Sequence, residues 1–131
     1  MRKLIVVALA VVVTAAVGLA QEQSVTQPGQ DMAKLAVAPK QMNGIGRMVV
    51  NITDTDGVPV NGAYAHLDSA RTDGFLCESW ASTNATGFAA LPPIHMGKLK
   101  LKVKAKGYRE QVVEVPYEEL SSPIVVKLKK K

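Results

Sequence analysis

From Arg47 onward the chain consists of short runs of alternating apolar residues, separated by turn residues at intervals of about ten, as in sandwiches and barrels of antiparallel strands. Alternation with a period of two places every second side chain on the same face of a strand. We therefore expect an all-β fold, and specifically a seven-stranded antiparallel β-sandwich. The predicted strands are Arg47–Thr53, Ala63–Ser69, Phe75–Ala81, Ala85–Leu91, Lys98–Lys106, Glu110–Val115 and Ile124–Lys129.

The same alternation predicts which side chains point into the core. Aromatic residues are scarce, with one Trp, three Tyr and two Phe, so this core should be mainly aliphatic. No convincing helical period follows residue 20, although Tyr117–Ser121 fits a single helical turn. The predicted inward residues are Met48, Val50, Ile52, Ala65, Leu67, Leu99, Leu101, Val103, Ala105, Val113, Val115, Ile124, Val126 and Leu128.

The N-terminal residues 1–20 have the layout of a secretory signal peptide. Arg2 and Lys3 precede the apolar run Leu4–Val13, and small residues lead up to Ala20. We expect cleavage between Ala20 and Gln21, which makes the protein secreted or periplasmic. The alternative is an uncleaved membrane anchor, although the apolar stretch is shorter than the roughly 17–25 residues of a spanning helix. Residues 21–45 are polar and rich in Gly and Pro, which predicts a flexible linker before a domain at 46–131.

Three stretches of the predicted domain carry turn motifs in a recognisable order. Val50–Ala63 contains the pattern D-x-x-G-x-P-V-x-G-A, and Ser82–Phe88 is similar to a T-D-x-x-G-x-F hairpin with Asn84 at the acidic position. Leu91–Pro93, followed after a wider loop by Leu101–Tyr108, is similar to an L-P-x-G-x-Y-x-L-x-V-x-A-x-G-Y run. Together they resemble the carboxypeptidase regulatory-like domain, a transthyretin-like β-sandwich. In metallocarboxypeptidases this module carries no catalytic residues, so the resemblance implies a binding or structural role.

The chemistry-bearing residues predict neither an enzyme nor a cofactor. The two histidines, His66 and His95, form no close ligand pair of the kind that holds zinc, so we interpret them as surface residues. Ser69, His66 and Asp68 could form a triad only on paper, because Ser69 and His66 point to opposite strand faces. Asp54–Gly57 is better explained as a hairpin turn than as a calcium loop, since the other calcium ligands are missing. A transthyretin-like small hydrolase is the less favoured alternative.

Charge is distributed unevenly along the chain. From Lys98 to the end there are ten Lys and Arg against four Glu, whereas the chain as a whole has a net charge of +5. Lysines on one strand face predict a basic stripe, for which plain solubility is the simpler role. The functional hypothesis is weak binding of a polyanion, such as an acidic polysaccharide of the cell envelope. The candidate residues are Lys98, Lys100, Lys102, Lys104, Lys106, Lys127 and Lys129.

The partner is therefore predicted to be an envelope or extracellular macromolecule, with no nucleic acid and with membrane contact only through an uncleaved signal. Trp80 is expected to pack in the core, and a solvent-exposed platform for a sugar ring is the alternative. Cys77 is expected to be a buried free thiol, and an intermolecular disulfide is the alternative. Asn51 and Asn84 match the N-glycosylation pattern, and of these Asn84 is the accessible acceptor.

Overall fold

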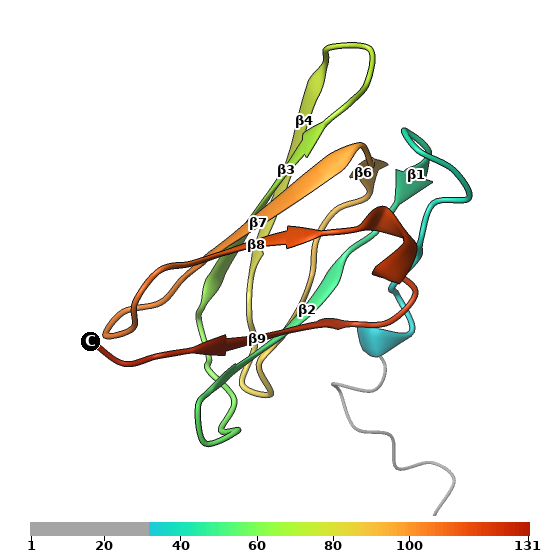
Figure 1. The fold of residues 1–131 in the computed structure, drawn as a ribbon. Coiled ribbons are helices and arrows are strands. Elements are labelled where there is room, and N and C mark those ends of the chain that lie inside the picture. The colour runs from blue at the N-terminus through green and yellow to red at the C-terminus, as the bar shows by residue number, and fades with distance from the viewer. Residues whose placement is uncertain (1–31) are drawn as a thin grey trace, which may run out of the picture.

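The computed structural model describes residues 32–131 (Figure 1). The predicted signal peptide, its cleavage point at Ala20 and Gln21, and the first part of the predicted linker lie outside the described residues. Among residues 32–131, no helix has the length and apolar character needed to cross a membrane.

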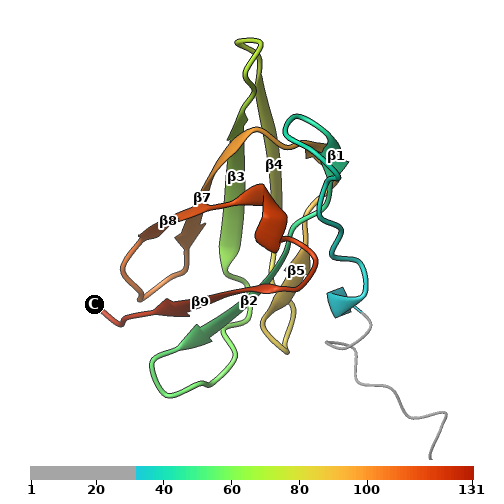
Figure 2. The ribbon, with the colours of Figure 1, turned by 45° about the vertical axis from the view of Figure 1, so that its right-hand side comes forward.

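The described residues form nine strands in three sheets (Figures 1 and 2). The four-stranded sheet has the order β4 (Leu76–Ser82), β3 (Tyr64–Ala70), β7 (Lys98–Lys104) and β8 (Gln111–Val115). The three-stranded sheet has the order β5 (Phe88–Ala90), β2 (Val49–Asp54) and β9 (Ile124–Leu128). A two-stranded sheet pairs β1 (Ile45–Gly46) with β6 (Ile94–His95). The only other regular element after β1 is the 3-10 turn η1 (Tyr117–Glu119).

The all-β prediction is confirmed, and each of the seven predicted strands overlaps an observed one, while the short strands β1 and β6 were not predicted. The prediction of uniformly antiparallel pairing is wrong, because β2 and β9 run parallel, with Val50 opposite Ile124 and Ile52 opposite Val126. The cause is the connection through η1, which takes the chain from β8 in one sheet to β9 in the other. Residue alternation is the same in parallel and antiparallel strands, so it could not reveal this direction.

One hydrophobic core is built from the facing sides of the two larger sheets. Ile52 and Leu128 from the three-stranded sheet and Leu67 and Leu101 from the four-stranded sheet are all completely buried in the same cluster. Every predicted inward residue belongs to this cluster or packs against it. The side chains of β3 and β7 that point away from the core form a separate, solvent-facing surface.

The chain that leads into β2 is bonded to the domain, in contrast to the predicted linker. Val37 and Arg47 exchange two backbone hydrogen bonds, and Ala38 packs against the core. The backbone N–H of Asn43 donates to the carbonyl of Met96 at 2.8 Å. The domain's packing therefore begins about nine residues earlier than the predicted boundary at residue 46, since backbone pairing does not depend on the polar composition that suggested a linker.

The turn after β2 forms as its residues predict. Asp54 Oδ1 accepts hydrogen bonds from the backbone N–H groups of Asp56 and Val58, at 2.8 and 2.9 Å. Gly57 has φ of 85°, a conformation that glycine adopts without strain. The Asp54 carboxylate is thus used to shape the turn, which supports the hairpin interpretation of this segment.

Candidate binding face

The surface of the four-stranded sheet that points away from the core is the main candidate for a site, and we call it the outer face. Strand register arranges its side chains in rows across β4, β3 and β7. One row contains Trp80, His66 and Lys102, and the next contains Glu78, Asp68 and Lys100. Val112 and Glu114 continue these two rows on β8. Aromatic, acidic and basic side chains therefore meet on one open β-surface.

Trp80 lies on the outer face with 55% of its surface exposed, so the prediction of core packing is wrong. The reason is strand parity, because the small residues Ser79 and Ala81 occupy the neighbouring inward positions of β4. The indole stacks on the ring of His66, with centroids 6.0 Å apart and an interplanar angle of 17°. The indole therefore lies exposed on the surface, which corresponds to the alternative interpretation of Trp80 as a solvent-exposed platform.

His66 is the centre of a polar cluster. Its Nε2 lies 3.1 Å from Asp68 Oδ1 and 3.2 Å from Glu78 Oε1. Its Nδ1 lies 3.3 Å from the hydroxyl of Tyr64. Asp68 follows His66 by two residues on β3, whereas Glu78 comes from the neighbouring strand β4. Because the ring is stacked against Trp80 and bonded at both nitrogens, its orientation is fixed from three sides.

The predicted lysine stripe is only partly assembled. Lys98, Lys100, Lys102 and Lys104 are exposed on the outer face, as predicted from their alternation on β7. Lys106 lies beyond the end of β7. Lys127 lies on β9 in the other sheet and Lys129 directly after it, so they do not extend the stripe.

Carboxylates flank this lysine row on both sides. Lys100 lies in register between Asp68 on β3 and Glu114 on β8. Lys104 Nζ lies 3.8 Å from Glu110 Oε1. The carboxylates of Asp68, Glu78, Glu110 and Glu114 therefore offset the four lysines of β7. The outer face therefore presents mixed charge, and the field expected of a purely basic stripe is largely cancelled.

A hollow of about 270 Å³ opens on the same face beside Asp68 and Glu114. Its lining includes Asp68, Leu76, Lys100 and Glu114, which come from all four strands of the sheet. The hollow places charged hydrogen-bonding groups next to apolar surface. At this volume it is smaller than the roughly 300–1,000 Å³ of typical small-molecule pockets.

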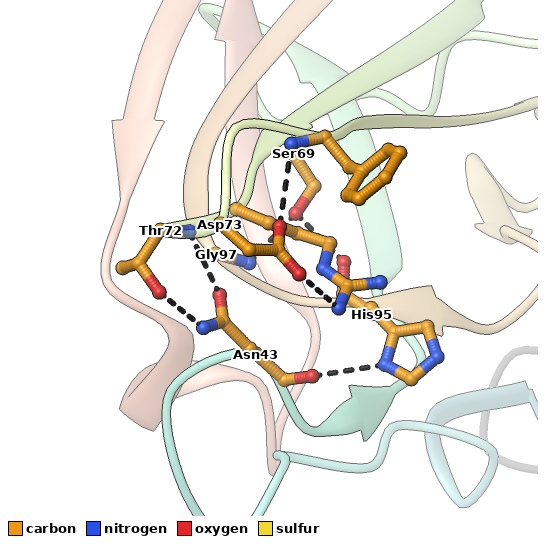
Figure 3. Close-up of polar contacts among 8 residues, drawn as sticks. Asn43, Ser69, Thr72, Asp73, His95 and Gly97 are labelled. Carbon is orange, nitrogen blue, oxygen red and sulfur yellow. Dashed lines mark hydrogen bonds and ion pairs between the residues drawn. The ribbon is translucent and has the colours of Figure 1, made fainter.

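A second polar network ties the turn end of the β3–β4 hairpin to the segment before β2 (Figure 3). The hydroxyl of Ser69 donates to the carbonyl of His95 and accepts from the N–H of Gly97, both at 2.7 Å. His95 Nδ1 lies 2.9 Å from the carbonyl of Asn43, whose side chain bonds to Thr72. Ser69 is completely buried, whereas His66 lies on the outer face, as predicted when the triad was rejected. The hydroxyl of Ser69 thus serves to fasten the backbone.

Cys77 and Asn84, which were both singled out in the sequence, lie in local structure as follows. Cys77 is a free cysteine on β4 and is half-buried, so it is less enclosed than the buried thiol that was predicted. The carboxamide oxygen of Asn84 accepts hydrogen bonds from the backbone N–H groups of Thr86 and Phe88, at 3.0 and 3.1 Å. Asn84 is half-buried and shapes the turn before β5, and its glycosylation stays a prediction.

Neither a family model nor any curated protein matches this chain.

The grouping of His66, Asp68 and Glu78 was missed from the sequence. The spacing His-x-Asp on a predicted strand was a usable signal, because residues two apart share a face. Glu78 could be added only with the hairpin register, which sets Asp68 opposite Glu78 and His66 opposite Trp80. Ligand pairs at helical or loop spacing are therefore not the pattern of this cluster, which is formed across two strands.

Proposed function

We propose that this protein is a non-enzymatic binding module and that its outer face binds a saccharide through Trp80. The observation that carries the proposal is the exposed indole of Trp80, stacked flat on His66 in a chain with few aromatic residues. A large ring left in solvent forgoes the free energy that burial of an aromatic side chain provides. A ligand with a flat apolar face, such as a pyranose ring, recovers that free energy when it covers the indole.

The groups around Trp80 suit a ligand rich in hydroxyls. The carboxylates of Asp68 and Glu78 accept hydrogen bonds, and Lys102 in the row of Trp80 donates them. Tyr64, which is 37% exposed, can do both. Hydrogen bonds to charged groups are stronger than those between neutral groups, which favours a sugar over a purely apolar ligand.

The test is a panel of neutral and acidic polysaccharides offered to the wild-type protein and to Trp80→Ala. We expect wild type to be retained by at least one polysaccharide, with a change in Trp80 fluorescence, and Trp80→Ala to lose retention. Phe75→Ala is the matched control, since Phe75 is 68% exposed but stands next to the hairpin turn, outside the platform. Retention that is equal for wild type and Trp80→Ala, or absent for every glycan, would contradict the proposal.

A polyanion is the second candidate ligand, and it is favoured at a different place from the predicted stripe. The turn after β7 meets the C-terminus, where Arg109 N–H donates to the carbonyl of Lys129 and Lys131 N–H donates to that of Gly107. Lys106, Arg109 and Lys129–Lys131 are all exposed, and the C-terminus lies beside the turn that joins β7 to β8 (Figure 1). Basic residues gathered in this way attract anionic polymers in a manner that salt weakens.

Retention on heparin distinguishes the two lysine groups. We expect changing Lys129, Lys130 and Lys131 together to Gln to lower the salt concentration of elution more than changing Lys100, Lys102 and Lys104. The offsetting carboxylates of the outer face are the reason. The opposite ranking would return the polyanion site to the lysine row of β7.

We further infer that the chain is exported and that its domain is of the carboxypeptidase regulatory-like, transthyretin-like kind. The motif order, the all-β fold and the turn at Asp54–Gly57 support this proposal of a family. The layout of residues 1–20 supports export. Intact-mass analysis of the secreted protein should give Gln21 as its first residue, and recovery of the uncleaved chain from membranes would contradict export by a cleaved signal.

A further inference from the structure

We propose that His66, Asp68 and Glu78 form a binding site for a divalent metal ion, with zinc as its best fit. The three residues come from β3 and β4, and one ligand atom from each lies within 4.8 Å of the others. This inference goes beyond saccharide binding and does not depend on it, because the cluster can hold a cation whether or not a sugar covers Trp80.

The distances within the cluster are close to those of a metal centre. Four ligands at the usual zinc bond lengths of about 2.0–2.2 Å are separated from one another by about 3.3–3.6 Å in a tetrahedron. Nε2 of His66 lies 3.1 Å from Asp68 Oδ1 and 3.2 Å from Glu78 Oε1. The ring nitrogen is therefore already nearly as far from each carboxylate oxygen as zinc ligands are from one another, and both carboxylate side chains are partly exposed.

The donor set also favours zinc over harder cations. One imidazole nitrogen with two carboxylate oxygens is a common set for zinc, whereas calcium and magnesium prefer oxygen alone. Three protein ligands leave one tetrahedral position for water or for an oxygen of a bound ligand. Since the cluster lies on the open outer face, that fourth position faces solvent.

The surroundings hold the histidine in the orientation that a metal requires. A metal on Nε2 leaves the proton on Nδ1, which lies 3.3 Å from the hydroxyl of Tyr64. A tyrosine hydroxyl can donate to the bare nitrogen or accept from the protonated one, so Tyr64 serves both states. Such hydrogen bonds to the second ring nitrogen are usual for metal-binding histidines. The stack on Trp80 restrains the ring plane as well.

Neighbouring charges moderate the affinity without blocking the site. Lys100 and Lys102 are in register with Asp68 and His66, so their positive charges oppose a bound cation. Among residues 32–131, however, no Lys or Arg nitrogen lies within 4.0 Å of the Asp68 or Glu78 carboxylates. Both acidic side chains therefore remain available as ligands.

Trp80 supplies a direct readout, because it is the only tryptophan of the chain and stacks on the proposed ligand. We would titrate Ni²⁺, whose open d shell quenches nearby fluorescence, into protein without a polyhistidine tag. We expect saturable quenching at one ion per chain and its reversal by Zn²⁺, which is not a quencher. Calorimetry with Zn²⁺ gives the affinity independently of fluorescence.

Variants locate the ion. His66→Gln, Asp68→Asn and Glu78→Gln should each weaken Zn²⁺ binding at least tenfold, whereas Glu114→Gln, an acidic control on the same face, should not weaken it. Lys102→Gln should strengthen Zn²⁺ binding severalfold at low salt, because it removes a positive charge in register with His66. Circular dichroism shows whether each variant is folded.

Two outcomes would overturn the proposal. One is the absence of saturable binding up to millimolar Zn²⁺. The other is equal Zn²⁺ affinity in wild type and the folded Asp68→Asn and Glu78→Gln variants, which would place the ion elsewhere. Loss of polysaccharide retention in Trp80→Ala with Zn²⁺ affinity retained would separate this site from the sugar platform.

Discussion

The hydroxyl of Ser69 is expected to contribute more to stability than any other serine hydroxyl of the four-stranded sheet. It is completely buried, and its Oγ donates to the carbonyl of His95 while it accepts from the N–H of Gly97, both at 2.7 Å (Figure 3). These bonds fasten β3 to the end of β6 and to the residue that precedes β7. The backbone at residue 97 passes so close to Ala70 that only glycine fits, because a Cβ there would lie 2.2 Å from the carbonyl oxygen of Ala70.

Ser69→Ala removes both bonds and leaves two backbone groups without partners. A buried polar group left unpaired costs about 1–3 kcal/mol, so we expect the free energy of unfolding to fall by about 2–4 kcal/mol. Ser79 makes one such bond, to the carbonyl of Pro92 at 2.6 Å, and Ser79→Ala should cost about half as much. Ser82, which is exposed on the same sheet, is the control, and Ser82→Ala should stay within about 0.5 kcal/mol of wild type.

Urea unfolding followed by far-UV circular dichroism measures the series, provided that each variant unfolds in a single transition. For a domain of this size, 1 kcal/mol shifts Tm by about 4–8 °C, so Ser69→Ala should melt roughly 10–25 °C below wild type. Ser82→Ala should be the most stable of the three variants, Ser79→Ala the next and Ser69→Ala the least stable. Equal midpoints for Ser69→Ala and Ser82→Ala would refute the argument from buried hydrogen bonds.

Three further predictions concern the core, a turn and the start of the domain. Leu101→Ala should lower the free energy of unfolding by about 2–5 kcal/mol in urea titration, because Leu101 is fully buried in the core. Gly87→Ala should destabilise more than Gly57→Ala in the same assay, since both have positive φ but only a Cβ at Gly87 meets a backbone oxygen, at 2.6 Å. A chain beginning at Gly44 should still show a β-type circular dichroism spectrum. Its melting temperature should be lower than that of a chain beginning at residue 32, because it lacks the pairing of residue 37 with residue 47 and the bonds of residue 43. Equal melting temperatures for the two chains would contradict this.

The outer face shows how far reasoning from the sequence could reach. Alternation correctly predicted that Lys98, Lys100, Lys102 and Lys104 share a surface, because both neighbours of a residue in a strand always point to the other side. It gave no information about the strands on either side. The carboxylates that offset these lysines became visible only with the pairing of β7 to β3 and β8.

Local chemistry determined the strands, the inward residues of the core and the turn at Asp54–Gly57, since each depends on residues within a few positions of one another. Tertiary structure decided the parallel pairing of β2 with β9, which depends on a connection between two sheets. It also decided that Trp80 faces solvent and that Glu78 meets His66. Strand order and register join residues that are distant in sequence, and the free energy that selects them comes from packing of the whole core, which no short stretch of sequence contains.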